Sequence, residues 1–166
     1  MSIKQRDKSY RGNASQFFVA GELCRRGYAA VVTLGNTLNT DILCSNQAGT
    51  RFVHIQVKTF VPGGKTCSVG IKAEKHFGPR FFWVLAGIPH PPSRSFECFV
   101  IPSAFMARNV RKFHKRWLAT PGKSGQPHKD NTVRAVNVPP NAYPYLWTIE
   151  RYRERWDLIA KQLADP

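Results

Sequence analysis

The sequence predicts an α/β domain in which a mixed central β-sheet is flanked by helices. Three observations carry this prediction: two segments have helical spacing of apolar residues, one segment alternates apolar and polar residues, and one short run is apolar throughout. With 166 residues the chain has the length of a single domain, 1–166. We expect a basic leader at 1–11, a core at 12–102, and a C-terminal part at 103–166 with a basic helix, a mobile loop and a final helix.

The first expected element is a helix over residues 14–26. Phe17, Gly21 and Cys24 have the spacing of one stripe along a helix. Val19, Ala20 and Leu23 lie beside this stripe. Gly27 follows directly and has the backbone freedom that commonly ends a helix. Residues 28–34 then form a β-rich run before a turn-like sequence.

A β-hairpin is expected next. Asp41 opens a short apolar run at 42–44, a polar turn occupies 46–50, and residues 51–60 alternate in polarity. One face of the alternating segment is apolar and the other polar: Val53, Ile55 and Val57 against His54, Gln56 and Lys58. This pattern predicts a strand with one buried side, paired with the strand that Asp41 opens.

Two further strands and a helix follow. Residues 81–86 are apolar throughout, which predicts a central strand buried on both faces, and residues 96–101 predict another strand. Ser103 is expected to cap a helix that reaches about residue 118 and exposes a basic face.

The remaining chain is expected to begin with a mobile basic loop at 120–131 and a short extended piece at 132–138. Thr148 is then expected to cap a final amphipathic helix over 149–163. Four large residues share one side of that helix: Tyr152, Trp156, Ile159 and Leu163.

The chain is strongly basic, with 25 Lys and Arg against 10 Asp and Glu and a formal net charge of +15. Lys and Arg displace the counterions that condense on phosphate backbones, so nucleic acid is the expected partner. A basic surface that serves only solubility and attachment to anionic lipid are the alternatives. The expected phosphate contacts follow the alternating strand and continue on the 103–118 helix and its loop: Lys65, Lys72, Lys75, Arg80, Arg111, Lys112, Lys115, Arg116, Lys123 and Lys129.

No targeting or membrane segment is recognisable in the sequence. The N-terminus lacks an apolar stretch and no apolar run reaches 18 residues, so we expect a cytoplasmic protein without membrane attachment. The cysteines, which contain no C-x-x-C pair, are expected to be reduced core residues: Cys24, Cys44, Cys67 and Cys98. The tryptophans are expected to be packing aromatics in preference to base-stacking platforms: Trp83, Trp117, Trp147 and Trp156.

Three polar residues are expected to converge at one end of the sheet. Gln56 and Lys58 project from one strand face, about 6.5–7 Å apart, and Asp41 opens the paired strand. Metal-dependent hydrolysis of a phosphodiester needs hard oxygen ligands and a cation near the phosphate. These residues offer a carboxylate, an amide oxygen and an ammonium. The structural alternatives are a turn residue for Asp41 and a lysine that extends to solvent for Lys58.

The order of these residues resembles the PD-(D/E)XK nuclease superfamily. A helix that ends in the sequence ELCRRGY at 22–28, a strand opened by Asp41, and the sequence HIQVKT at 54–59 are similar to its helix, D and (D/E/Q)-x-K elements. The Gln variant resembles archaeal Holliday-junction resolvases and some homing endonucleases. The match covers about 12–60 and continues weakly to 102, which makes 12–102 a nuclease-like core.

The resemblance implies a metal-dependent phosphodiesterase fold with Mg²⁺ or Mn²⁺ as its cofactor. Asp41 would bind the metal, Gln56 would contribute an oxygen, and Lys58 would position water or stabilise developing charge. Relatives commonly have a Glu about four residues after the glycine that opens the first helix, and here that place holds Gln16. Glu22 is the one carboxylate on this helix, but it lies about 120° around the axis from Gln16.

Both Gln16 and Glu22 are therefore auxiliary candidates for the site. Gln16 is either an oxygen donor to the metal shell or a structural amide, and Glu22 is either a site residue or an ion-pair partner of Arg25 and Arg26.

The sequence thus favours a metal-dependent DNA endonuclease. The first alternative is a catalytically inactive nucleic-acid-binding module with a nuclease-like fold, and the second is a protein that recognises an acidic partner. Paired cuts in duplex DNA would favour a homodimer.

Overall fold

Residues 8–34, 37–89, 94–141 and 147–165 are described by the structure, which is a computed structural model. They form a five-stranded sheet of order β1-β2-β3-β5-β6. Its strands are β1 (Ala29–Val32), β2 (Ile42–Ser45), β3 (Phe52–Phe60), β5 (Phe81–Gly87) and β6 (Glu97–Pro102). All neighbouring strands are antiparallel except β3 and β5, which run parallel. The predicted mixed central sheet is therefore confirmed.

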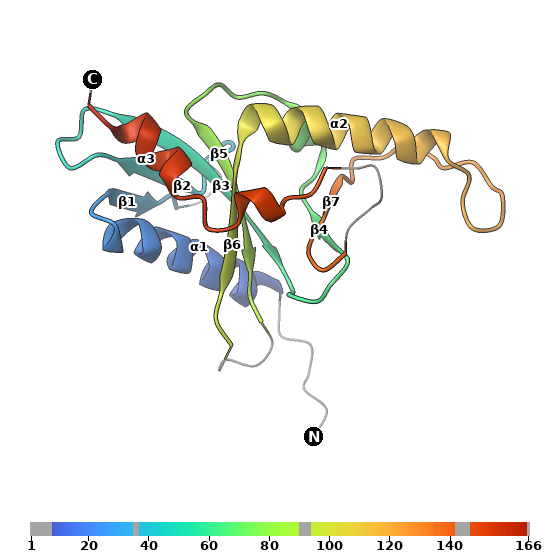
Figure 1. The fold of residues 1–166 in the computed structure, drawn as a ribbon, viewed down its shortest axis with the longest axis horizontal. Coiled ribbons are helices and arrows are strands. Elements are labelled where there is room, and N and C mark those ends of the chain that lie inside the picture. Colours follow the sequence, from blue (N-terminus) through green and yellow to red (C-terminus); the bar gives the residue numbers. More distant parts are fainter. Residues whose placement is uncertain (1–7, 35–36, 90–93, 142–146, 166) are drawn as a thin grey trace.

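Helices cover both faces of this sheet (Figure 1). The helices α1 (Lys8–Arg25) and α3 (Asp157–Leu163) pack on one face, together with the apolar side chains of β2 and β3. The helix α2 (Ser103–Ala119) covers the other face. That side also holds a small sheet of β4 (Thr66–Ser68) and β7 (Ala135–Asn137), and two 3-10 helices, η1 (Ile71–Glu74) and η2 (Glu150–Tyr152).

The two strands with the clearest patterns take the predicted burial. In β3, Val53 and Ile55 are fully buried whereas His54 between them is exposed, so the alternating segment has one core face. All seven residues of β5 are buried, as expected for a strand covered on both sides. The predicted hairpin between the Asp41 strand and β3 is also confirmed, since β2 and β3 pair antiparallel.

The predicted stripe of α1 is wrong, because the flanking residues face the core. Val19 and Leu23 are fully buried, whereas Phe17 is 66% exposed. The hydroxyl of Ser15, one turn before Val19, hydrogen-bonds the hydroxyl of Thr59 on β3 at 2.6 Å, which turns this side of the helix toward the sheet. The helix also begins at Lys8, so it includes part of the expected leader.

The C-terminal segment is not one continuous helix, although its four large residues are buried as predicted. Glu154 interrupts it with a positive φ of 50°. The backbone N–H of Glu154 donates to the carbonyl of Cys98 at 2.9 Å, and the Glu154 carboxylate accepts from the N–H of Cys98 at 2.8 Å. These bonds satisfy the outer edge of β6, which local helical spacing could not reveal.

Two smaller elements were not predicted. β4 has three residues and pairs with β7 about seventy residues later, and η1 follows it directly. A three-residue strand that pairs over such a separation has no local sequence pattern, so β4 was missed. Its partner β7 lies within the extended piece expected at 132–138.

The cysteine prediction is correct for three residues and wrong for one. Cys44, Cys67 and Cys98 are buried free thiols, whereas Cys24 is free and exposed because it lies on the outer side of α1. Among the tryptophans, Trp83 and Trp156 are buried as expected, but Trp117 and Trp147 are only partly covered. No helix in the described ranges is long and apolar enough to cross a membrane.

Candidate functional site

Asp41 and Gln56 lie opposite each other on neighbouring strands. The Asp41 backbone N–H donates to the carbonyl of Ile55 at 2.9 Å, and the Asp41 carbonyl accepts from the N–H of Thr33 at 2.9 Å. The backbone of Asp41 is therefore fixed from both sides. Its Oδ2 accepts a hydrogen bond from Nε2 of Gln56 and another from the N–H of Val57 at 2.7 Å.

These two hydrogen bonds leave other oxygens for a ligand. No described residue donates to Oδ1 of Asp41, and because Gln56 uses its nitrogen toward Asp41, its amide oxygen is directed elsewhere. The orientation of the amide follows from the hydrogen-bond network, since a carboxylate can only accept. The pair therefore presents one carboxylate oxygen and one neutral amide oxygen.

Lys58 lies two residues further along β3 and projects from the same face as Gln56. Burial raises the pKa of the Asp41 carboxyl and of the Cys67 thiol on β4, and the positive charge of Lys58 lowers both pKa values by less. The ammonium therefore lies within electrostatic reach of both groups. Lys58 makes no ion pair with a carboxylate in the described ranges, so its charge is available to an anionic ligand.

Burial dominates the electrostatics of Asp41. Partial removal from water raises the pKa of its carboxyl above 3.8, and the Val57 N–H, the Lys58 charge and the Gln56 amide each lower it by less. The ionised carboxylate is therefore incompletely compensated by the protein. A bound cation would stabilise it further, and metal uptake would compete with a proton at acidic pH.

The oxygen donors fit a hard divalent cation only as a partial set. Mg²⁺ is commonly bound through one or two carboxylates, several waters and the oxygens of a substrate phosphate. Asp41 and Gln56 match that pattern at its lower limit. Within the described residues there is no group of three or more His, Cys, Asp or Glu side chains that could hold a metal ion.

The two auxiliary candidates on α1 are not joined to this rim. α1 packs on the sheet face that carries Ile55 and Val57, whereas Gln56 and Lys58 project from the opposite face. Glu22 instead accepts from Arg25 and Arg26 at 2.8 and 2.7 Å. The interpretation of Glu22 as an ion-pair partner is confirmed.

Gln16 is half-buried, and no hydrogen bond to another described residue engages its amide. Its neighbour Ser15 makes the contact between α1 and β3 instead. The structure therefore brings together Asp41, Gln56 and Lys58 and leaves Gln16 and Glu22 apart from them.

The ten cations expected to contact phosphate are all exposed, and none forms an ion pair with a described carboxylate. The described carboxylates are occupied elsewhere, as in the pairs of Glu74 with Arg134 and of Asp157 with Arg155. The surface charge is therefore not neutralised within the chain, and it is available to a polyanion.

Two contacts of the site were missed by sequence reasoning. The first is the hydrogen bond from the N–H of Val57 to Asp41. The second joins the Thr40 hydroxyl to Nδ1 of His54 at 3.1 Å, so His54 is an exposed residue with a hydrogen-bond partner. A backbone donor carries no residue-specific signal. Thr40 precedes Asp41 in the sequence, so the predicted hairpin already indicated that Thr40 could contact the polar residues of 51–60.

Comparison with solved structures identifies the architecture. A bacterial homing endonuclease superposes with a TM-score of 0.55 at 15% sequence identity, over 93% of this chain and 93% of that chain. This chain has a restriction-endonuclease-like fold. The Holliday junction resolvase Hjc of Archaeoglobus fulgidus matches with a TM-score of 0.43 at 15% identity, over 76% of this chain and 83% of that chain.

The resemblance to the restriction-endonuclease-like nucleases is thus confirmed for the fold, and the significance of the Q-x-K variant stays a prediction. No family model matches the chain. No curated protein matches it either.

Proposed function

We propose that this protein is a divalent-metal-dependent endonuclease that hydrolyses phosphodiester bonds in DNA. The observation that carries the proposal is the convergence of Asp41, Gln56 and Lys58 on one rim of the sheet, in a restriction-endonuclease-like fold. A carboxylate oxygen, an amide oxygen and an ammonium are the groups that this reaction requires.

Each residue has a separate role in this proposal. Asp41 and Gln56 would hold Mg²⁺ or Mn²⁺ through their remaining oxygens, and a bound divalent cation supplies Lewis acidity to a phosphodiester. The Val57 N–H and the Gln56 amide orient the carboxylate of Asp41. Lys58 stabilises the negative charge that develops on phosphate or positions the attacking water.

The exposed cations support nucleic acid as the substrate. They lie on α2, on and near η1, and in the 120–131 loop, and α2 and η1 pack on the sheet face from which Gln56 and Lys58 project. Contacts of this kind hold the phosphate backbone without reading bases. Each phosphate neutralised by the protein should add about −0.9 to the slope of log K against log salt for duplex DNA.

A second candidate function is a binding module that has lost its metal site. The observation that favours it is the scarcity of carboxylates, since Asp41 is the one acidic side chain that the described part of the chain places at the rim and Gln16 stands where relatives have Glu. Binding that is unchanged by Mg²⁺ or Mn²⁺, together with no nicking of supercoiled, branched or single-stranded DNA, would establish this alternative.

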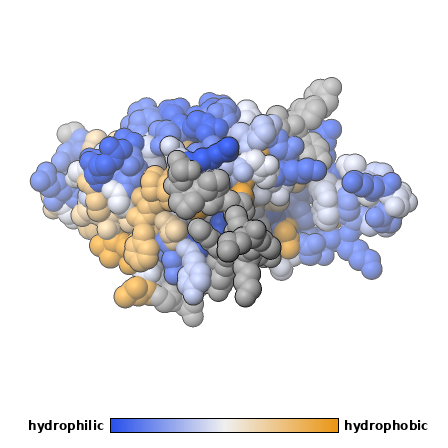
Figure 2. All heavy atoms as spheres, turned by 90° about the horizontal axis from the view of Figure 1, so that it is seen from below, coloured by the Kyte–Doolittle hydropathy of each residue, from blue (hydrophilic) through white to orange (hydrophobic). Residues whose placement is uncertain are grey.

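We also propose that the protein forms a homodimer through the outer side of α1. Tyr10 is 71% exposed and Phe17 is 66% exposed. On the same helix, Ala14 lies between them and Gly21 follows Phe17. Figure 2 shows apolar side chains gathered over this part of the molecule. Because this stripe is uncharged in a chain of net charge +15, two copies can approach there with least repulsion. Phe17→Glu should then convert a dimer to a monomer in sedimentation equilibrium.

The proposed reaction is tested by nicking of supercoiled plasmid in Mn²⁺. Asp41→Ala and Lys58→Ala should each reduce nicking by at least about 100-fold, since each removes a group that acts on the transition state. Asp157→Ala and Lys161→Ala are matched controls that remove the same charges from exposed positions on α3, on the opposite face of the sheet from Gln56 and Lys58. Equal nicking by all of these proteins would refute the assigned site.

A further inference from the structure

Trp117, near the end of α2, is part of an aromatic stack. Its ring centroid lies 4.0 Å from that of His128 with an interplanar angle of 14°, and 5.4 Å from that of His114 with an angle of 26°. Nδ1 of His128 bonds the Trp117 carbonyl at 2.8 Å, and Nε2 of His114 bonds Asp130 at 2.7 Å. The orientation of the rings is therefore fixed by contacts within the chain.

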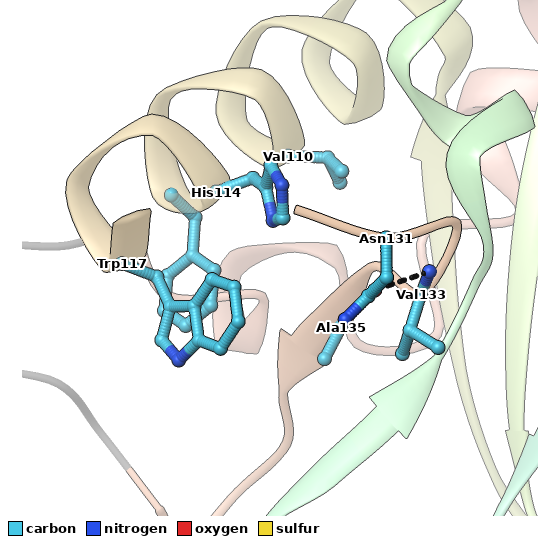
Figure 3. Close-up of a pocket in the computed structure, with 7 residues that line it drawn as sticks. Val110, His114, Trp117, Asn131, Val133 and Ala135 are labelled. Atoms are coloured by element: carbon cyan, nitrogen blue, oxygen red, sulfur yellow. Dashed lines mark hydrogen bonds between the residues drawn. The ribbon is translucent and has the colours of Figure 1, made fainter. Parts of the chain in front are cut away.

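Two hollows adjoin this stack and share Trp117 and Phe113 in their walls. The first, of about 210 Å³, lies between α2 and the segment 131–135. Figure 3 shows the rings of His114 and Trp117 on one side of it and Asn131, Val133 and Ala135 on the other. The second, of about 340 Å³, extends toward Thr120 and His128. Together they form what we call the α2 groove, with mainly apolar and aromatic walls.

The rim of the α2 groove is positively charged. Arg116 and Lys123 line the second hollow directly. Between residues 103 and 135 the sequence has eight Lys and Arg and one acid, Asp130. That acid is engaged by His114 and Arg134, while Arg116 and Lys123 form no ion pair with any described carboxylate.

We propose that the α2 groove binds an unpaired nucleobase through Trp117 and His128 and holds its flanking phosphates with Arg116 and Lys123. Flat aromatic walls beside free cations are the combination that binds single-stranded nucleic acid, because every base has a face that can stack. Duplex DNA hides these faces between its base pairs. An acidic peptide would match the charge but would leave the aromatic walls without a flat partner.

The position of the groove relates it to the rim of Asp41. α2 packs on the sheet face that holds Trp83 and Leu85, and these residues are the register partners of Gln56 and Lys58. The groove and the rim are therefore on one side of the sheet. The inference deepens the proposed function, since it assumes that the protein binds nucleic acid, and it names DNA with unpaired bases as the preferred substrate.

The test is a fluorescence-anisotropy titration in EDTA with a fluorescein-labelled single-stranded oligo(dT) and with a labelled duplex of equal length. The label is on the DNA, so the affinity of every variant can be measured, including variants without Trp117. The wild type should bind the single strand, and Trp117→Leu should weaken this binding by roughly 5- to 100-fold, as expected for loss of one stacking platform. His128→Ala, in a loop outside the core, should also weaken it.

Phe105→Leu is the matched control, because Phe105 is an exposed aromatic at the other end of the same helix. This variant should bind as the wild type does. If Trp117→Leu does not fold, as judged by circular dichroism, His128→Ala and Arg116→Glu decide the question.

Wild-type affinity in the Trp117 and His128 variants would overturn the proposal, as would equal affinity for the duplex or equal competition by polyglutamate. Because the titration contains no metal and scores no cleavage, a protein without nuclease activity still gives a result. The failure of this inference is thereby distinguished from the failure of the proposed reaction.

Discussion

Replacement of Gln56 by Glu tests the geometry of the rim through protein stability. In the wild type the Gln56 amide donates to Asp41, so Gln56→Glu replaces a hydrogen bond to a carboxylate with a second carboxylate. A hydrogen bond to a charged group contributes about 1.5–3 kcal/mol. Two charges about 4 Å apart repel by roughly 4 kcal/mol at an effective dielectric constant of 20. Protonation of the new carboxyl at pH 8 costs about 5 kcal/mol and limits the sum of these two effects, so we expect the free energy of unfolding at pH 8 to fall by up to about 5 kcal/mol.

The loss should depend on pH with a definite sign. Repulsion raises the folded-state pKa of the new carboxyl above its unfolded value near 4.3, so the folded protein binds the extra proton more tightly. The stability of the variant is therefore retained below the unfolded-state pKa near 4.3. It is lost as the pH rises from that value through the higher folded-state pKa. At pH 5 protonation costs only about 1 kcal/mol, and the protonated Glu can donate to Asp41 again. The destabilisation should therefore be smaller at pH 5 than at pH 8.

Divalent cations should reverse the effect at pH 8, because the variant has two carboxylates at the rim. A concentration 100-fold above Kd stabilises the folded state by about 2.7 kcal/mol. The assay is urea unfolding at both pH values with and without Mg²⁺. Gln47→Glu is the matched control, since Gln47 is exposed in the β2–β3 turn and gains the same charge away from Asp41. If both variants showed the same stability, pH dependence and response to Mg²⁺, the proposed geometry would be refuted.

Three further outcomes follow from the structure. Cys24 should be the thiol that iodoacetamide modifies in the folded Phe17→Glu variant, in which no dimer covers α1, because burial raises the pKa of each of the other three; rapid modification of more than one thiol, counted by mass spectrometry, would contradict this. Asp41→Asn should become progressively more stable relative to the wild type as the pH rises from 4 to 7, because burial raises the pKa of Asp41; a constant difference in urea unfolding would disprove it. Arg134→Met should lower the free energy of unfolding by about 3–5 kcal/mol, because it leaves Glu74 without its buried partner. Adding Glu74→Gln in the same chain should restore part of the loss. An unchanged free energy of urea unfolding in Arg134→Met alone would contradict this role.

The elements predicted correctly are those whose signal is local. The alternation of residues 51–60 and the continuous apolar run at 81–86 each reflect how one strand meets its two faces, and β3 and β5 show that burial. The juxtaposition of Asp41 with Gln56 was predictable for the same reason, because a hairpin with a short turn fixes which residues face each other.

The elements predicted wrongly depend on contacts between distant parts of the chain. The buried side of α1 is selected by the contact of Ser15 with Thr59, and the break at Glu154 satisfies the edge of β6. Neither contact leaves a periodic trace in the sequence. The stack of Trp117 with His128 is formed by a loop that returns to α2, and it agrees with the packing role predicted for this tryptophan. The expected location in the cytoplasm stays a prediction.

In the proposed site, Asp41 and Gln56 share a divalent cation with a phosphate at the edge of the sheet. Crystals grown with Mn²⁺ and a short oligonucleotide would test it through the anomalous scattering of manganese. We expect a peak within coordination distance, about 2.0–2.4 Å, of a carboxylate oxygen of Asp41 and the amide oxygen of Gln56, with a phosphate oxygen as a further ligand. A manganese ion bound elsewhere, with the Asp41 carboxylate still closed onto Gln56 and Val57, would contradict it.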